Sequence, residues 1–269
     1  MKYLAFNESW NSSIKALYEY DQLEIFQPIT RKMRHYQLPY LNRREMVLTF
    51  FKKNCSHVKS VIDVGAAQGN FSLSLAEEGY RVTWNDIRFE IVDYVKEKYE
   101  FGEINFLTGN IFDLDSENKF DCVLITEIIE HVAHPDLFLA RCKELLSPQG
   151  LIIMTTPNGK YFRNKLPKFS ECSDPSFYES IQFKPDSDGH IFLLHPDEIY
   201  KLALSCNLRV SEFNFFNNFI SSGHLKTRYI FKIFPNAFIS FLEVISRKLP
   251  PIFSAKIHAQ AFVVLNQKS

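Results

Sequence analysis

The chain has 269 residues, with 31 basic and 31 acidic side chains, and 46% of its residues are hydrophobic. This is enough for one large globular domain with a substantial core. The balanced charge argues against a DNA or RNA partner, because nucleic acid binding needs a basic surface. The five cysteines form no CxxC pair, and the N-terminus lacks the apolar segment of a signal peptide. We expect a cytoplasmic protein with reduced thiols and no transmembrane segment.

The first 57 residues form an extension that precedes the first strand. Trp10–Tyr20 and Asn42–Lys53 have helical patterns. The segment between them contains Pro28 and Pro39 and is expected to be irregular. The extension is either a packing arm or a lid over a pocket, and both interpretations stay open.

From Val58 onward, apolar strand patterns alternate with helical patterns, which predicts a largely parallel α/β sheet. The expected strands are Ser60–Val64, Arg81–Asn85, Ile104–Thr108, Phe120–Thr126, Leu151–Thr155, Leu208–Phe216 and Ile257–Asn266. The expected helices are Phe71–Glu78, Phe89–Tyr99, Pro135–Leu146, His195–Ser205 and Asn236–Arg247. Ser147–Gly150 is expected to be a turn, and residues 156–188 a long loop.

The pattern divides the chain into an arm or lid (1–57), a core (58–218), an apolar helical insertion (219–256) and a last core strand (257–269). The insertion is the part whose role is least defined. It could pack over the sheet, cover an apolar substrate, form a dimer face or make peripheral contact with a membrane surface.

The most informative stretch is VIDVGAAQG, followed downstream by VTWND. The first strand ends at Asp63 and leads into a tight turn of small residues, where backbone N–H groups and a helix N-terminus meet a ligand. An acid at this entrance repels a phosphate but suits an ammonium group, so S-adenosylmethionine fits better than a dinucleotide. Asp86, at the end of the second strand, suits the acceptance of hydrogen bonds from ribose hydroxyls.

These motifs, with GNI, FDCVLITEIIEHV and LLSPQGLIIMTTPN in the same order, resemble those of class I S-adenosylmethionine-dependent methyltransferases over about Val58–Asn217. Ala67 stands where that family usually has a second glycine. The resemblance implies a seven-stranded, mostly parallel Rossmann-like sheet with helices on both faces. It also implies the residues that hold S-adenosylmethionine: Asp63, Gly65, Ala67, Gly69, Asp86, Ile87, Asn110, Ile111 and Thr126.

Candidate catalytic groups follow the fourth strand, where Glu127, Glu130 and His131 form an E-x-x-E-H pattern. Their spacing places them on one face if the segment is helical. With the later His190, the pattern resembles two metal-assisted groups, the ubiquinone-type O-methyltransferases and the small-RNA 3′-terminal ribose methyltransferases. The resemblance implies that these four residues bind Mg²⁺, Mn²⁺ or Zn²⁺. In an alternative without metal, Glu130 and His131 mainly hold the loop after the fourth strand in place. His190 then acts as a base or contacts the substrate.

We expect an enzyme that methylates a small molecule at oxygen, with a sugar or a quinone- or polyketide-like metabolite as acceptor. His190 and His131 are the expected catalytic residues. Two alternatives remain open, a metal-dependent RNA ribose 2′-O-methyltransferase and a non-catalytic Rossmann-type binding protein.

Overall fold

A computed structural model describes residues 1–30, 32–115, 117–182, 189–222 and 234–268. The parts of the predicted loop and insertion at 183–188 and 223–233 lie outside these residues. Seven strands form one sheet in the order β3-β2-β1-β4-β5-β7-β6, in which β7 alone runs antiparallel to its neighbours. The strands are β1 (Ser60–Val64), β2 (Arg81–Asp86), β3 (Glu103–Thr108), β4 (Phe120–Thr126), β5 (Leu146–Pro157), β6 (Leu208–Asn218) and β7 (His258–Gln267). The predicted seven-stranded, mostly parallel sheet is confirmed.

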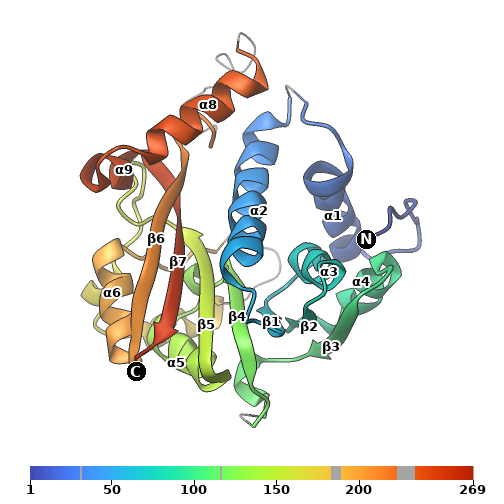
Figure 1. The fold of residues 1–269 in the computed structure, drawn as a ribbon, viewed down its shortest axis with the longest axis horizontal. Helices are drawn as coiled ribbons and strands as arrows, with labels where there is room; N and C mark the ends of the chain where they lie inside the picture. Colours follow the sequence, from blue (N-terminus) through green and yellow to red (C-terminus); the bar gives the residue numbers. More distant parts are fainter. Residues whose placement is uncertain (31, 116, 183–188, 223–233, 269) are drawn as a thin grey trace.

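Helices cover both faces of this sheet, as predicted (Figure 1). The helices are α1 (Ser12–Asp21), α2 (Arg34–Asn54), α3 (Asn70–Glu77), α4 (Val92–Lys98), α5 (Pro135–Glu144), α6 (Pro196–Ser205), α8 (Asn236–Arg247) and α9 (Pro251–Ile257). One core lies between α5, α6 and the sheet, and the other lies between α2, α3 and the opposite face. None of the helices in the described ranges is both long and apolar enough to cross a membrane.

The central strands β1 and β4 have the bounds that the sequence predicts. Val61, Ile62, Leu124 and Ile125 are fully buried, because these strands have strands on either side and helices on both faces. The two strands pair in parallel, so their carboxyl ends open at the same edge of the sheet. This edge is where open α/β sheets bind their ligands.

Two expectations about the chain outside the central strands are wrong. Helix α2 begins at Arg34, and Pro39 lies inside it rather than in an irregular segment. Packing of its Val47 and Phe51 against the sheet offsets the backbone hydrogen bond that proline cannot make. Ser147–Gly150 belongs to β5 instead of forming a turn, with an irregular register where β5 pairs with the start of β4.

The N-terminal arm is attached to the core by a buried ion pair. Asp21 of α1 accepts a hydrogen bond from Lys98 of α4, and both side chains are completely buried. The ammonium of Lys98 also donates to the carbonyl of Gln68 and to the side chain of Asn70. Because these two residues follow the first strand, the arm is fastened directly to the predicted cofactor turn.

Candidate active site

The turn after β1 has an unusual backbone. Gly65, Ala67 and Gly69 have positive φ angles of 64°, 47° and 73°. A Cβ atom on Gly65 would lie 2.4 Å from the side chain of Ile128, so glycine is required there. Ala67 adopts this conformation although it has a side chain, and its N–H donates to the carboxylate of Asp86 at 2.9 Å. The turn is thereby joined to the end of β2.

Asp63 lies behind the turn instead of facing the cavity beside it. Its carboxylate is buried and accepts a 2.6 Å hydrogen bond from the Ser72 hydroxyl through Oδ2. Its Oδ1 atom has no hydrogen-bond partner among the described residues. Burial raises the pKa of Asp63 to about 7, partly offset by the Ser72 hydrogen bonds. A direct contact of Asp63 with a ligand stays a prediction.

Asp86 faces the cavity, and Arg88 occupies much of its hydrogen-bonding capacity. The Nε and Nη2 atoms of Arg88 donate to the two carboxylate oxygens, each at 2.9 Å. Arg88 lies only two residues after Asp86, so its side chain folds back along the edge of the sheet. The sequence analysis did not assign Arg88 a role, although its position after the predicted ribose acid was a usable signal.

The cavity at this edge has a volume of about 290 Å³. It contains seven of the nine predicted cofactor residues: Gly65, Ala67, Asp86, Ile87, Asn110, Ile111 and Thr126. Asp63 and Gly69 do not line it, and Gly69 instead precedes the first residue of α3. Five lining residues were not predicted: Val64, Asn85, Arg88, Ile128 and Phe138. We call this cavity the donor cavity.

A second cavity of about 300 Å³ lies between the N-terminal arm and the ends of β5, β6 and β7. Most of its lining residues have a polar group in the side chain, although more of the exposed wall is apolar than polar: Glu24, His35, Tyr36, Pro39, Tyr40, Arg43, Glu127, Pro157, His190, Asn217, Ser222, Ala259 and Gln260. We call it the acceptor cavity. Most of its residues come from the arm and the late strands, and the sequence motifs gave no signal for them.

Glu127 lines both cavities and therefore marks where they meet. Its φ angle is +56°, which turns its side chain sharply from the direction of β4. One carboxylate oxygen lies 3.4 Å from the Arg43 guanidinium and also accepts from the Gln260 amide. Although burial opposes its charge, Glu127 and Glu24 raise the pKa of Arg43.

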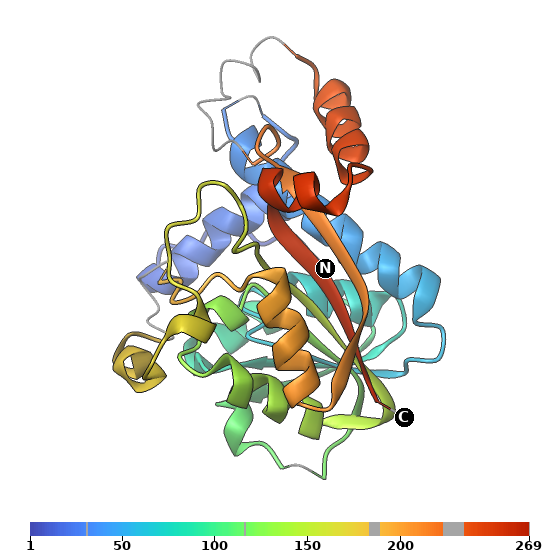
Figure 2. The ribbon, with the colours of Figure 1, turned by 90° about the vertical axis from the view of Figure 1, so that its left-hand side faces the viewer.

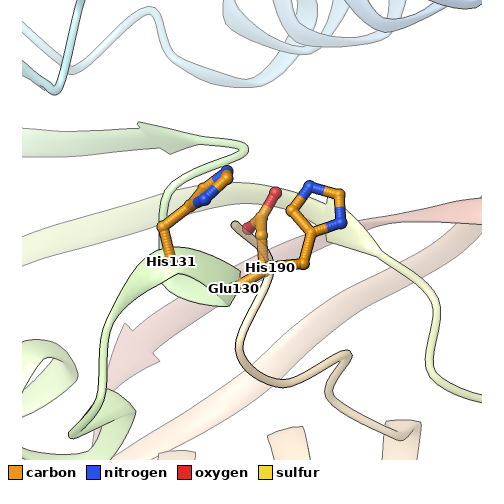
Figure 3. Close-up of side chains that lie close together, drawn as sticks. All are labelled: Glu130, His131 and His190. Carbon is orange, nitrogen blue, oxygen red and sulfur yellow. The ribbon is translucent and has the colours of Figure 1, made fainter. Parts of the chain in front are cut away.

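Glu130, His131 and His190 offer ligand atoms that all lie within 4.8 Å of one another (Figure 3). The imidazole rings of His131 and His190 have centroids 4.8 Å apart. The N–H of Ile191 donates to the backbone carbonyl of Glu130 at 2.7 Å, which holds the chain after the long loop against this group. His131 lines the donor cavity and His190 lines the acceptor cavity.

Glu130 is the buried member of the group. Burial, together with the charge of Glu127, raises its pKa well above the usual value. Its Oε2 atom accepts from the Thr156 hydroxyl at 3.2 Å, and Oε1 has no partner among the described residues.

Three of the four predicted metal ligands thus lie together, and Glu127 lies outside the group. The sequence placed the three residues of the E-x-x-E-H pattern on one face only if the segment is helical, and that condition is not met at Glu127, because only Ile129–His131 is helical, as a single 3₁₀ turn. The left-handed backbone at Glu127 directs its carboxylate toward Arg43 instead.

Comparison with known proteins agrees with this architecture. A family model described as a methyltransferase domain matches residues 33–212. The fold is similar to the magnesium protoporphyrin IX methyltransferase from Synechocystis PCC 6803 with bound SAH, at a TM-score of 0.58 and 11% identity over 94% of this chain and 95% of that one. It is also similar to a SAM-dependent methyltransferase from Archaeoglobus fulgidus, at a TM-score of 0.52 and 15% identity over 93% and 99%. The chain belongs to the methyltransferase domain family and has the fold of the class I S-adenosylmethionine-dependent enzymes.

The relatives found by sequence similarity have names that state a particular O-methylation. The chain is 29% identical over 184 residues to the ubiquinone biosynthesis O-methyltransferase of Rickettsia akari, covering 62% of this chain and 65% of the relative. It is 28% identical over 167 residues to the enzyme of that name from Coxiella burnetii, covering 56% and 64%. The chain thus spans less than two thirds of the length of these relatives.

Proposed function

We propose that this chain uses S-adenosylmethionine to methylate an oxygen of a small aromatic diol of the quinol type. The observation that carries the proposal is the placement of His131 and His190 on either side of the junction between two cavities, beside the buried Glu130. A donor and an acceptor held in such adjoining cavities meet in a geometry that suits an in-line displacement.

The donor cavity fits S-adenosylmethionine. The ribose hydroxyls would bind Asp86, which lines the cavity. Asp63 lies behind the turn, and its buried Oδ1 atom would accept from the ammonium group only if the turn shifts when the cofactor binds. Asn110 uses its carboxamide oxygen to accept from the Phe112 N–H, so its NH₂ group is the end suited to the adenine, beside Ile111. S-adenosylmethionine supplies an electrophilic methyl group on a sulfonium.

The acceptor cavity fits a molecule with several hydroxyl groups. Tyr36, Asn217 and Gln260 provide hydrogen-bonding groups on its wall, and His190 faces it from the opposite segment. In the proposed reaction, an imidazole removes the proton of the acceptor hydroxyl while its oxygen forms a bond to the methyl carbon and the carbon–sulfur bond breaks. The names of the sequence relatives favour a quinol over a sugar or a polyketide-like acceptor.

The site also has the donor set of a divalent metal centre. Glu130 and Glu127 each keep one carboxylate oxygen without a partner among the described residues, and two imidazoles lie beside Glu130. Glu130, His131 and His190 would hold a Mg²⁺, Mn²⁺ or Zn²⁺ ion, with Glu127 as a fourth ligand after a side-chain rotation. Such an ion would act as a Lewis acid that lowers the pKa of the acceptor hydroxyl.

Chelation distinguishes a metal-dependent reaction from the metal-free alternative. If the metal is required, excess EDTA abolishes turnover without changing the melting temperature, and added Mg²⁺, Mn²⁺ or Zn²⁺ restores it. Full turnover of extensively dialysed protein in EDTA would show that Glu130 does not act as a ligand of a required metal ion. His190 would then be the base. The binding of S-adenosylmethionine, followed by calorimetry in the same samples, serves as the control for an intact donor cavity.

The proposed activity is tested by offering a benzenediol with a short isoprenoid tail, a monosaccharide and an RNA oligonucleotide with S-adenosylmethionine. Mass spectrometry is expected to find one added methyl group on the diol. Methylation of RNA alone would contradict the proposal, as would a protein that binds S-adenosylmethionine but methylates none of the three. The balanced net charge supports the small molecule over RNA. The five cysteines are free thiols, which supports the cytoplasm as the location.

A further inference from the structure

Helix α8 carries most of its apolar side chains on its outward face. Its inward face combines the apolar Ile239 with the charged Glu243, both of them buried. The inward Glu243 is buried and accepts from the N–H groups of Asn217 and Asn218 and from the Ser221 hydroxyl. Although burial opposes ionisation, Arg247 and these donors lower the pKa of Glu243. This charged anchor holds α8 to the end of β6, beside the apolar cluster that Ile239 forms with Leu38.

The outward face of α8 carries Phe238, Phe241, Val244 and Ile245, all of them exposed. Their spacing of three, four and seven residues places them on one side of the helix, opposite Ile239 and Glu243. Helix α9 and the residues before it add three more exposed apolar side chains, Leu249, Ile252 and Phe253, of which Ile252 is 68% exposed. We call these seven side chains the apolar ridge.

Helices α8 and α9, which carry the ridge, lie at the end of the molecule where the chain leaves β6 and enters β7 (Figures 1 and 2). Contiguous apolar surfaces of this kind mark interaction sites in otherwise polar proteins. The inward sides of the insertion's helices contact β6, so packing on the sheet stays one possible role of the insertion as a whole.

The charge around the ridge favours an anionic partner. Between residues 234 and 257, the basic residues are Arg247, Lys248 and Lys256, and the only acid is the buried Glu243. Neither Lys248 nor Lys256 forms an ion pair with the described residues. A symmetric pairing of two ridges would bring these cations toward one another, which disfavours a dimer through this face.

A groove of about 690 Å³ adjoins the ridge between α6, β6 and α9. It combines the cations Lys160, Arg247 and Lys256 with the apolar side chains of Phe213, Leu249 and Ile252. This mixture suits an amphiphile with an anionic head group. Exposed aromatic and aliphatic residues flanked by basic residues are the features of helices that lie in a membrane interface.

We propose that the apolar ridge docks on the surface of an anionic lipid bilayer. The same helix connects the ridge to the acceptor cavity, because Glu243 binds the backbone of Asn217, whose side chain lines that cavity. An acceptor with an isoprenoid tail would then reach the cavity from the bilayer. Only this last step rests on the proposed function, and the docking itself depends on the ridge and its cations alone.

Vesicle flotation tests the docking without any turnover. The wild-type chain is expected to bind vesicles of phosphatidylcholine and phosphatidylglycerol at least tenfold more tightly than vesicles of phosphatidylcholine alone, because each basic residue near an anionic surface adds about fivefold. The double variant Phe241→Asp/Ile252→Asp is expected to lose at least about tenfold, since two apolar side chains no longer enter the interface. Lys248→Glu/Lys256→Glu is expected to abolish the preference for the anionic vesicles.

Leu137→Asp is the matched control, because Leu137 is an exposed apolar residue (54% exposed) on the distant helix α5 and lies outside the ridge. It is expected to bind vesicles as the wild type does. Thermal melting and methylation of a tail-free diol show that each variant is folded and active. If only the docking proposal is wrong, the wild type still methylates the tail-free diol. If the proposed function is wrong, the wild type does not methylate it either.

A wild-type protein that stays unbound with both kinds of vesicle would overturn the docking proposal. Equal binding by the Phe241→Asp/Ile252→Asp variant and the wild type would do the same. A third contrary result is a wild-type dimer in analytical ultracentrifugation that Phe241→Asp/Ile252→Asp converts to a monomer, with no binding to vesicles.

Discussion

The guanidinium of Arg88 makes two hydrogen bonds of 2.9 Å to the carboxylate of Asp86, the residue that ends β2 in the donor cavity. The same carboxylate accepts from the backbone N–H groups of Ala67 and Arg88. The two backbone bonds and the two guanidinium bonds together use both oxygens of the carboxylate. If Asp86 binds the ribose hydroxyls as we propose, the Arg88 guanidinium has to release its bonds when the cofactor binds.

This relationship separates the effects of two substitutions. Asp86→Ala is expected to weaken S-adenosylmethionine binding more than about tenfold, the scale of a lost hydrogen bond to a charged group. Arg88→Ala is expected to keep or improve the affinity, because it frees the acceptor oxygens. Calorimetry measures both. A tenfold loss in Arg88→Ala would mean that Arg88 itself binds the cofactor.

The raised pKa of Asp63 predicts a pH dependence of stability. The folded state keeps this proton up to about pH 7, whereas an ordinary carboxyl in the unfolded chain loses it near pH 3.8. The folded state thus binds more protons between these values, and stability falls as the pH rises through this window, by up to about 4 kcal/mol. Asp63→Asn removes this contribution.

Urea unfolding of the protein without cofactor, at pH 5 and pH 8, compares the two forms. The wild type is expected to lose more stability than Asp63→Asn between these pH values. The same pH slope in both proteins would show that Asp63 ionises normally in the folded chain.

The buried pair of Lys98 and Asp21 predicts a strong dependence of stability on both partners. Lys98→Met leaves the Asp21 carboxylate buried without its cation and is expected to cost about 3–5 kcal/mol. Asp21→Leu/Lys98→Met removes both charges and is expected to recover much of this loss. Denaturant unfolding of the two variants measures the difference. A single variant as stable as the wild type would show that the arm is held mainly by other contacts.

The central motifs of the fold could be predicted because local sequence determines them. The apolar runs of β1 and β4 and the periodicity of α8 gave bounds that match the structure. The start of α2 was predicted too late, because proline usually ends a helix and Pro39 was therefore placed outside it. In the structure, the packing of the rest of the helix outweighs this preference of a single residue. Helix α9 was missed, because a seven-residue helix that starts at the second of two consecutive prolines has little periodicity.

The site was predicted where its residues follow strands of the sheet and was missed where they come from elsewhere. Asp86, Asn110 and Thr126 lie at strand ends, and the parallel topology brings them to one edge. The direction of the Glu127 side chain depends on a positive φ that its sequence does not signal. Arg43 joins the site through the docking of α2, which depends on tertiary contacts.

The central claim is that methyl transfer takes place between the two cavities with His190 on the acceptor side. The direct test compares kcat for the diol and the Kd for S-adenosylmethionine in the wild type, His190→Asn and His195→Asn. His195 is the matched control, because it lies five residues away at the N-cap of α6, a position that asparagine also suits.

His190→Asn is expected to lower kcat by about a hundredfold while the Kd for the cofactor changes less than about threefold, as loss of an acid–base group or ligand requires. His195→Asn is expected to keep most of the turnover. Wild-type turnover in His190→Asn would contradict the account, because the reaction would then occur without the residue that defines the acceptor side of the site.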